Sequence, residues 1–370
     1  MIKKTFMAVI TISLLLFSIA VGIHFSSAQS ETQVSGIINQ DTTWTKANSP
    51  YNFVGPVGIL DGVTLTIQAG VIVNLNNYYL QVNGTLSAIG TSTNPIYING
   101  GGLYGVYFTS SSVDCTIENS VINSTTTASI YIINASPNIL NNVINGHIEV
   151  DIGGSPVVSN NTITGSLTVY GSPVISNNTI KIGPFSGTSC IITQGSATVS
   201  NNIIEGDGAG EGIWTGGNPI ISNNTISNFA TGIRAYYSST IEDNLITNNY
   251  IGIDVGLGIN LIQNNTIVYN YDGLNSPKNS SNIIYNNVQN NSNYNIHLDV
   301  YSASNVTAFY NWWGTNNITL ANLTFNYMWN GFDIVTVSFI PLLTSPNLDA
   351  PAIPVSTPSP TPSITPAQTP

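Results

Sequence analysis

The sequence predicts an all-β chain wound into a parallel β-solenoid, with about 21 residues in each coil. Three observations predict this fold: a repeated segment, recurring asparagines, and a composition poor in helix formers. Asn occurs 50 times among the 370 residues, and only 6% of the residues are Lys, Arg, Asp or Glu. Because Asn, Gly, Thr, Ile and Val favour turns and strands, the composition argues against a helical bundle.

The repeat is clearest in three near copies, Pro156–Ile163, Pro173–Ile180 and Pro219–Ile226. A residue that recurs once per coil lies over its own equivalent, so a side-chain amide there can donate to one neighbour and accept from the other. We therefore expect the second Asn of each pair to form a structural row along the axis, extended by Ser120 before it and Trp312 after it. The row consists of Asn142, Asn161, Asn178, Asn202, Asn224, Asn244, Asn265 and Asn287.

The coil pattern Ile-x-x-Asn-x-Ile … Gly-Ile-x-Val resembles the repeats of the pectin-lyase-like superfamily, including NosD-type domains, over about Cys115–Gly314. The segments Asp41–Trp44 and Asn311–Gly314 resemble parts of microbial surface β-helix proteins. The resemblance implies a single-stranded right-handed parallel β-helix. This fold hosts lyases, hydrolases, adhesins and passive spacers, so it does not by itself imply a function. The Cys and His residues have no ligand-like spacing, so the copper association of NosD-type proteins is not expected to apply.

The N-terminal residues 1–28 resemble a secretory signal peptide. Lys3 and Lys4 form a basic start, an apolar run follows over Phe6–Ile23, and small residues precede the expected cleavage after Ala28. A retained membrane anchor is the alternative, since the apolar run is near the lower length for spanning a bilayer. In both cases the rest of the chain is exported, so we expect a secreted or cell-surface protein.

Residues 29–348 are predicted to form the β-helix, with Gln33–Tyr51 as an N-terminal cap. Residues 349–370 are rich in Pro, Thr and Ser and are predicted to be a disordered, extended spacer. A bulky cap is also expected at the far end, because the last coil of a solenoid exposes apolar surface and an open strand edge. Its aromatic candidates are Trp312, Trp313, Phe325, Tyr327, Trp329 and Phe332.

The charge balance limits the partners of the chain. It carries 6 Lys and Arg against 17 Asp and Glu, so it cannot neutralise a row of phosphates and nucleic acid is excluded as a partner. We expect a monomer, with no membrane span once the signal is cleaved, and a polysaccharide or cell-surface glycan as the candidate ligand.

A candidate ligand-binding stripe follows from a second row, Gly212, Gly232, Gly252 and Gly273. The residue two positions after each Gly is expected to point outward, because the Ile or Leu beside the Gly points inward. This places Trp214, Arg234, Asp254 and Asn275 in one exposed stripe, joined by Tyr236. An aromatic ring beside an Arg–Asp pair suits a sugar, through stacking and directed hydrogen bonds. The alternative is a surface salt bridge with a Trp covering a strand.

Two further groups of polar residues are candidates. Glu205, Asp207 and Glu211 lie in a Gly-rich loop and could chelate Ca²⁺, although a solvated acidic loop has the same sequence. No other cofactor is expected. His147, Glu149 and Asp151 alternate with apolar residues and so share one face of a strand, where metal binding or acid–base chemistry is conceivable and a solvated face is the alternative.

No catalytic residue can be assigned, because the sequence lacks the Asn-Thr-Asp and Gly-His-Gly signatures of polygalacturonases and the Arg cluster of pectate lyases. The sequence therefore favours a non-enzymatic role. The leading hypothesis is an exported cell-surface or secreted β-helix with a structural, adhesive or carbohydrate-binding role. The alternative is a polysaccharide lyase or glycoside hydrolase of the same fold, since exposed carboxylates are available.

Overall fold

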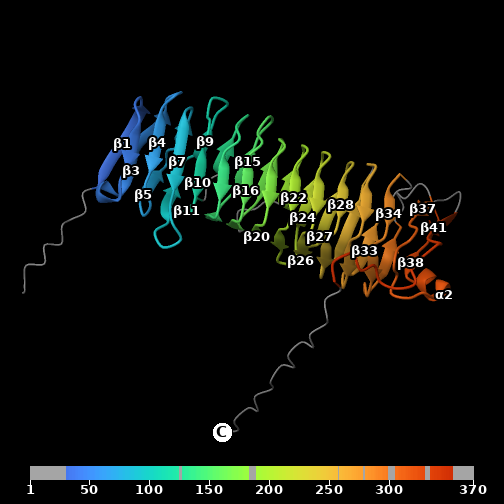
Figure 1. Ribbon diagram of the computed structural model, residues 1–370. Coiled ribbons are helices and arrows are strands. Elements are labelled where there is room, and N and C mark those ends of the chain that lie inside the picture. The colour runs from blue at the N-terminus through green and yellow to red at the C-terminus, as the bar shows by residue number, and fades with distance from the viewer. Residues whose placement is uncertain are drawn as a thin grey trace, which may run out of the picture.

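The computed structural model describes residues 31–124, 127–182, 189–256, 258–277, 280–298, 305–329 and 334–352. The predicted signal peptide and most of the predicted spacer lie outside these residues. The described chain is a rod of stacked windings that runs from β1 at one end to α2 at the other (Figure 1). Each complete winding contributes one strand to each of three parallel ladders, here called ladders 1, 2 and 3 in chain order. The all-β fold of the prediction is confirmed.

Ladder 1 has twelve short strands, and each is paired in parallel with the next. They are β2 (Thr42–Trp44), β4 (Thr64–Ile67), β7 (Thr85–Ile89), β10 (Thr116–Glu118), β13 (Asn138–Leu140), β16 (Val157–Ser159), β19 (Val174–Ser176), β22 (Thr198–Ser200), β25 (Ile220–Ser222), β28 (Thr240–Glu242), β31 (Leu261–Gln263) and β34 (Asn282–Ile284).

Ladders 2 and 3 begin together, because the long strands β1 (Thr32–Ile38) and β3 (Tyr51–Ile59) span both. Ladder 2 continues through β5 (Ile72–Asn76), β8 (Ile96–Gly100), β11 (Ser120–Asn123), β14 (Val143–Asn145), β17 (Thr162–Thr164), β20 (Thr179–Lys181), β23 (Ile203–Glu205), β26 (Thr225–Ser227), β29 (Leu245–Thr247), β32 (Thr266–Val268) and β35 (Asn287–Gln289). Ladder 3 continues through β6 (Leu80–Val82), β9 (Tyr104–Phe108), β12 (Ala128–Ile132), β15 (Ile148–Val150), β18 (Leu167–Val169), β21 (Ser189–Thr193), β24 (Glu211–Thr215), β27 (Thr231–Ala235), β30 (Ile251–Val255), β33 (Asp272–Asn275), β36 (Tyr294–His297) and β38 (Phe325–Asn326).

The core lies inside the three ladders and consists mainly of Ile, Leu and Val. In one winding these residues are Val199, Ile204 and Ile213, one from each ladder, and all three are completely buried. Each pairs with an Ile of the next winding, so branched side chains stack along the axis. Burying one such side chain stabilises the fold by about 1.5–3 kcal/mol.

The corner between ladders 1 and 2 explains the paired asparagines. The first Asn of a pair adopts the left-handed backbone conformation, with φ 57° at Asn177, Asn201 and Asn223, which Asn tolerates better than most residues. The second Asn then points inward. Asn178 donates through its backbone N–H and its Nδ2 to Asn202 Oδ1, at 2.9 and 3.0 Å. The same pattern links Asn142, Asn161, Asn178, Asn202, Asn224, Asn244 and Asn265.

The predicted row is wrong at its C-terminal end, where Asn286 takes the position assigned to Asn287. Asn265 N donates to Asn286 Oδ1 at 2.9 Å, and Asn286 N donates to Asn311 Oδ1 at 2.8 Å, so Asn311 also replaces Trp312. The cause is Tyr285, whose φ of 58° gives it the left-handed position that Asn holds in earlier windings. The first Asn of this pair therefore falls inside the rod.

The two ends of the rod differ from each other. Within the predicted N-terminal cap, β1 and β2 already pair in parallel with β3 and β4, so this segment is itself the first winding. At the C-terminal end, Phe325 makes edge contacts with Trp313 and Phe339, with ring centroids 4.8 and 5.0 Å apart, and all three rings are buried. Phe332 lies outside the described residues.

Small elements accompany this C-terminal aromatic cluster. They are α2 (Ile318–Asn322), the parallel pair β37 (Val306–Thr307) and β41 (Val337–Ser338), and the antiparallel pair β39 (Met328–Trp329) and β40 (Ile334–Val335). One short 3-10 helix, η1 (Lys46–Asn48), lies near the N-terminal end of the rod. None of the helices in the described part of the chain is long and apolar enough to cross a membrane.

After β41 the chain runs back along the outside of the rod. Asn347 donates to Asn287 Oδ1 through its N–H at 2.7 Å and to Asn264 Oδ1 through its Nδ2 at 3.1 Å. Farther along, Thr266 Oγ1 donates to the carbonyl of Pro351. The segment 349–352, which was predicted to begin the spacer, therefore packs against the windings.

Candidate functional site

The outward side chains of ladder 3 form a straight column along the rod. In register, Trp214 pairs with Arg234, Arg234 with Asp254, Asp254 with Asn275, and Asn275 with His297. The structure therefore brings the stripe residues together on successive windings. The Gly row permits this close stacking: a Cβ on Gly232, for example, would lie 2.7 Å from the carbonyl oxygen of Gly252.

Charged side chains pair across the centre of the column. Arg234 Nε lies 2.8 Å from Glu211 Oε1 and 3.6 Å from Asp254 Oδ2. The Nε–H is not directed at either carboxylate as a hydrogen bond requires, so these contacts are ion pairs. Ser189 Oγ donates to Glu211 Oε2 at 2.8 Å, and Asn275 Nδ2 donates to Asp254 Oδ1 at 3.0 Å. The carboxylates are thereby held in place by neighbours on both sides.

An aromatic platform, defined here as Trp214 and Tyr236, borders the charged group. The two rings come from adjacent windings and lie nearly parallel, with centroids 6.3 Å apart and an interplanar angle of 20°. Tyr237 packs edge-on against Tyr236 at 5.1 Å. Tyr236 is 42% exposed, so its ring is available to a ligand.

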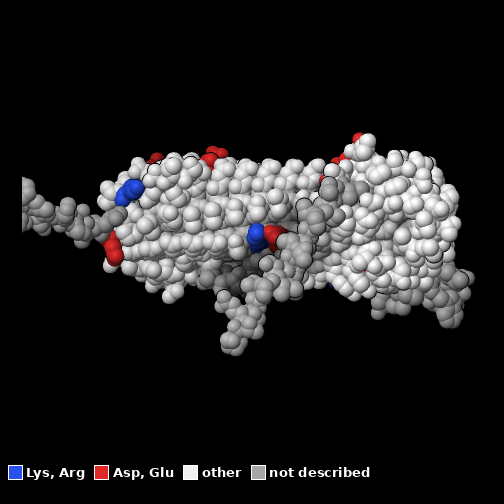
Figure 2. Space-filling model, turned by 90° about the horizontal axis from the view of Figure 1, so that it is seen from below, with Lys and Arg blue, Asp and Glu red and all other residues white. Residues whose placement is uncertain are grey.

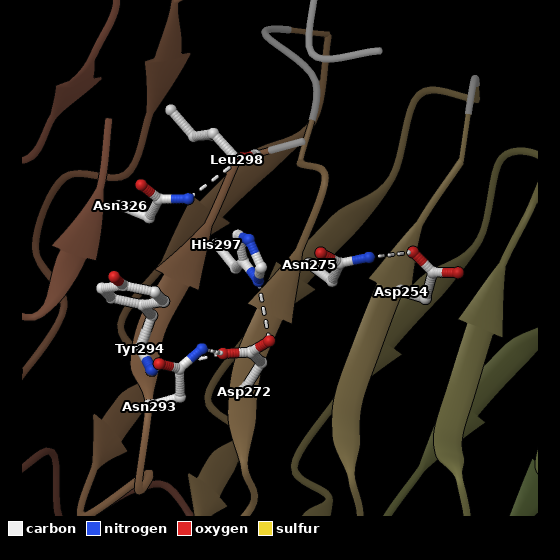
Figure 3. A network of polar contacts seen from close by, with 8 residues as sticks. All are labelled: Asp254, Asp272, Asn275, Asn293, Tyr294, His297, Leu298 and Asn326. Atoms are coloured by element: carbon white, nitrogen blue, oxygen red, sulfur yellow. Dashed lines mark hydrogen bonds and ion pairs between the residues drawn. The ribbon is translucent and has the colours of Figure 1, made fainter. Parts of the chain in front are cut away.

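Farther along the column lies a polar network that the sequence did not predict (Figure 3). His297 Nδ1 lies 2.7 Å from Asp272 Oδ2. Asp272 is buried and its other oxygen, Oδ1, accepts from Asn293 Nδ2 at 2.9 Å and from Tyr294 N at 3.2 Å. Asp272 directly precedes Gly273, so the Gly row could have indicated its position. Its contact with His297 could not be predicted, because 25 residues separate the two in the sequence.

The second predicted stripe belongs to the same face. Glu149 pairs with Thr168, Thr168 with Ile192, and Ile192 with Trp214, so one column contains both groups. Burial raises the pKa of Glu149, and the nearby Asp151 carboxylate adds to this effect. The ring of His147 is half-buried, and its Nδ1 lies 2.7 Å from Ser166 Oγ. Burial lowers the pKa of this imidazole.

A cluster of tyrosines on the same face was also missed. Tyr104 stacks on Tyr131 with ring centroids 4.3 Å apart and an interplanar angle of 8°, and Tyr107 contacts both rings. The Tyr131 hydroxyl donates to Asp151 Oδ2 at 3.3 Å. Tyr107 pairs in register with Tyr131. The two residues are one winding apart in the sequence, and this spacing could have indicated that their rings are neighbours.

The structure does not group the three carboxylates of the predicted calcium site, because each has a separate partner. Glu205 pairs with Lys181 at 2.8 Å, and Asp207 accepts from its own loop at Ala209 N. Glu211 pairs with Arg234 across the column. No three His, Cys, Asp or Glu side chains are grouped as metal ligands in the part of the chain that the structure describes.

Comparison with known proteins agrees with this geometry. Residues 170–325 match the family described as right handed beta helix region. Together with the parallel ladders, this match shows that the fold is a right-handed parallel β-helix. A search of curated proteins gives no significant match.

Among solved structures, this β-helix is similar to the A-module of a mannuronan C-5 epimerase from Azotobacter vinelandii. The identity is 14%, with 76% of this chain and 83% of that one covered and a TM-score of 0.28. A likeness of this strength carries no information about activity.

The site of this β-helix is thus an exposed face on which aromatic rings lie beside paired charged groups. Over the rod as a whole charge is sparse: on the side seen in Figure 2, Lys, Arg, Asp and Glu occupy a few small spots, and near the middle a basic and an acidic spot adjoin. Flat rings beside fixed hydrogen-bonding groups are suited to binding a polar ligand that also has apolar faces.

Proposed function

We propose that this chain is an exported monomeric β-helix that binds a polysaccharide along ladder 3. The observation that supports the proposal is the platform of Trp214 and Tyr236 beside the Arg234–Asp254 pair. A sugar ring has an apolar face that can stack on an aromatic side chain, and hydroxyl groups that can hydrogen-bond to carboxylates and guanidinium groups. Export and a secreted or cell-surface location rest on the signal-like residues 1–28, and NosD-type membership remains a prediction.

The Trp214→Ala variant tests the binding proposal by affinity electrophoresis in gels that contain a panel of soluble polysaccharides. We expect at least one polysaccharide to retard the wild-type protein, and Trp214→Ala to weaken that binding by about three- to tenfold, the loss of one ring contact and its apolar area. The matched control is Tyr285→Asn, which removes an exposed ring from a corner far from the platform and restores the residue found there in other windings.

Two outcomes would contradict the proposal: retardation by none of the polysaccharides, or equal retardation of the wild-type protein and Trp214→Ala. Export is tested separately. The mature protein recovered from the medium or cell surface should begin at Gln29, and recovery of the uncleaved chain from the cytoplasm would reject the signal peptide.

A polysaccharide lyase or glycoside hydrolase is the second candidate, and the Asp272–His297 pair favours it. If His297 Nδ1 donates to the carboxylate, Nε2 is left free to accept a proton, as a general base requires. His297→Gln should then abolish the release of unsaturated or reducing-end products while polysaccharide binding persists. The absence of such products from the wild-type protein would reject this candidate and leave the binding proposal intact.

A further inference from the structure

The column of ladder 3 extends well beyond the platform at Trp214. Tyr107 pairs with Tyr131, Tyr131 with Glu149, and Glu149 with Thr168. Ile192 then connects Thr168 to Trp214. The outward side chains of β9 to β27 are therefore neighbours in one unbroken line.

Aromatic rings recur along this line and its edge. Tyr170 immediately follows β18 and is 37% exposed, which places a ring between the tyrosine cluster and the Trp214 platform. From β9 to β27 the column advances by six windings, or about 29 Å at the usual spacing between paired strands. A flexible chain of sugar units could contact rings at both ends only if it lay along the axis. The rings are those of Tyr104, Tyr107, Tyr131, Tyr170, Trp214 and Tyr236.

The charges on this face determine which polymer can lie there. Among the described residues of the ladder 3 strands from β9 to β27 and of the turns that directly follow them, the acidic side chains are Asp114, Glu149, Asp151 and Glu211, and Asp254 lies on the next ladder 3 strand, β30. The one guanidinium, Arg234, already lies within ion-pair distance of Glu211 and Asp254. No cation on this described part of the face remains free to pair with a ligand carboxylate, and approach of a polyanion would bring like charges together.

We infer that ladder 3 is an extended track for an uncharged polysaccharide, which lies along the rod axis and contacts both the Tyr104–Tyr131 stack and the Trp214–Tyr236 platform. This inference rests on the proposed function and specifies its ligand. Together the two ring groups extend over about 29 Å along the axis, from β9 to β27, so a ligand that contacts both ends must contain several sugar units. Glu149 and Asp151 have no cationic partner among the described residues, so their carboxylates would repel a polyuronate on this face.

The ligand class is tested on the full-length mature protein at low salt, with uncharged glucans, mannans and xylans in one set and polygalacturonate in another. We expect retardation by at least one uncharged polymer and none by polygalacturonate. Binding of polygalacturonate as tight as that of the uncharged polymers would overturn the inference while the proposed function stands. Retardation by neither set would reject the proposed function itself.

The length of the track is tested with Tyr131→Ala and with oligosaccharides of the polymer that binds. The wild-type protein should bind a long oligosaccharide more tightly than a trisaccharide, and Tyr131→Ala should reduce this preference by about three- to tenfold, the contribution of a ring contact. Tyr285→Asn should preserve it, and thermal unfolding should show that both variants are folded. An unchanged preference in folded Tyr131→Ala would show that the tyrosine cluster is not part of the track.

Discussion

Two rows of asparagine run along this β-helix, one inside it and one outside. The inner row includes Asn178, Asn202 and Asn224, and its amides are almost completely buried. The outer row, on ladder 2, contains Asn52, Asn74, Asn99, Asn123 and Asn145, in which each amide donates to its neighbour at 2.7–3.2 Å. In both rows, successive amides along the axis are separated by one winding, so their spacing is similar.

The difference lies in what else each amide satisfies. Asn202 Nδ2 lies within 3.0 Å of Ile175 O, Ser200 O and Asn224 Oδ1, and Asn202 Oδ1 accepts from Asn178. An outer Asn makes side-chain bonds where water can replace them. The comparison teaches that the repeat creates the row, whereas burial determines how strongly the row stabilises the fold.

The largest expected effect comes from placing a carboxylate in the inner row. Asn202→Asp keeps the side-chain volume but removes both Nδ2 donors and brings an acid against backbone carbonyls. We expect the free energy of unfolding to fall by about 3–5 kcal/mol at neutral pH, as for an uncompensated buried charge. Because burial would raise the pKa of the new carboxyl, the loss should shrink as the pH falls toward 4.

The neighbouring Asn201→Asp is the matched control, since Asn201 is exposed and Asp243 already occupies the equivalent left-handed position in a later winding. Urea unfolding of the two variants checks the comparison. Similar losses in both would show that the inner row contributes no more than the corner residue beside it.

An intermediate effect is expected at His147, which is on the outer face yet substantially shielded from water. Because burial lowers the pKa of this imidazole in the folded protein, the unfolded chain binds a proton more readily. Its contribution to stability is therefore present above the ordinary pKa of about 6.5 and is lost as the pH falls below it. His147→Gln should flatten the dependence of the unfolding midpoint on pH between about 7 and 5. A wild-type slope that survives in this variant would assign the effect to another group.

The smallest effect is expected in the outer row. Asn123→Ala removes side-chain bonds to Asn99 and Asn145 at an exposed position, so the free energy of unfolding should change by less than about 0.5 kcal/mol. Urea unfolding measures this change. A loss as large as that of Asn202→Asp would show that burial is not what separates the two rows.

The fold was largely predictable from the sequence, because a solenoid uses the same local chemistry in every winding. Repeated Asn at the corner and Ile on the inward side indicated both the period and the core. The one-position error at Asn287 has the same origin. When Tyr285 replaced Asn at the left-handed position, the adjacent Asn286 and Asn287 could be aligned in two ways, and a one-residue shift exchanges inside for outside.

The candidate site was predictable only in part. Trp214, Arg234 and Asp254 follow equivalent glycines, so the sequence alone placed them on one stripe. Asp272 and His297 were missed because they occupy different offsets in their windings, and their contact depends on side-chain direction. The sequence could not decide between the two interpretations of the acidic loop for the same reason, since three carboxylates close in the sequence point to three different partners.

The sequence by itself determined the winding, the inward apolar side chains and the amide corners, because each depends on residues only a few positions apart. The tertiary structure alone decided that the tyrosine cluster, Glu149 and the Trp214 platform share one face. Windings differ in length, so the neighbour of a residue on the next winding is set by how the backbone hydrogen bonds align. The pairing register between successive windings therefore determines that these separate short motifs form one continuous surface.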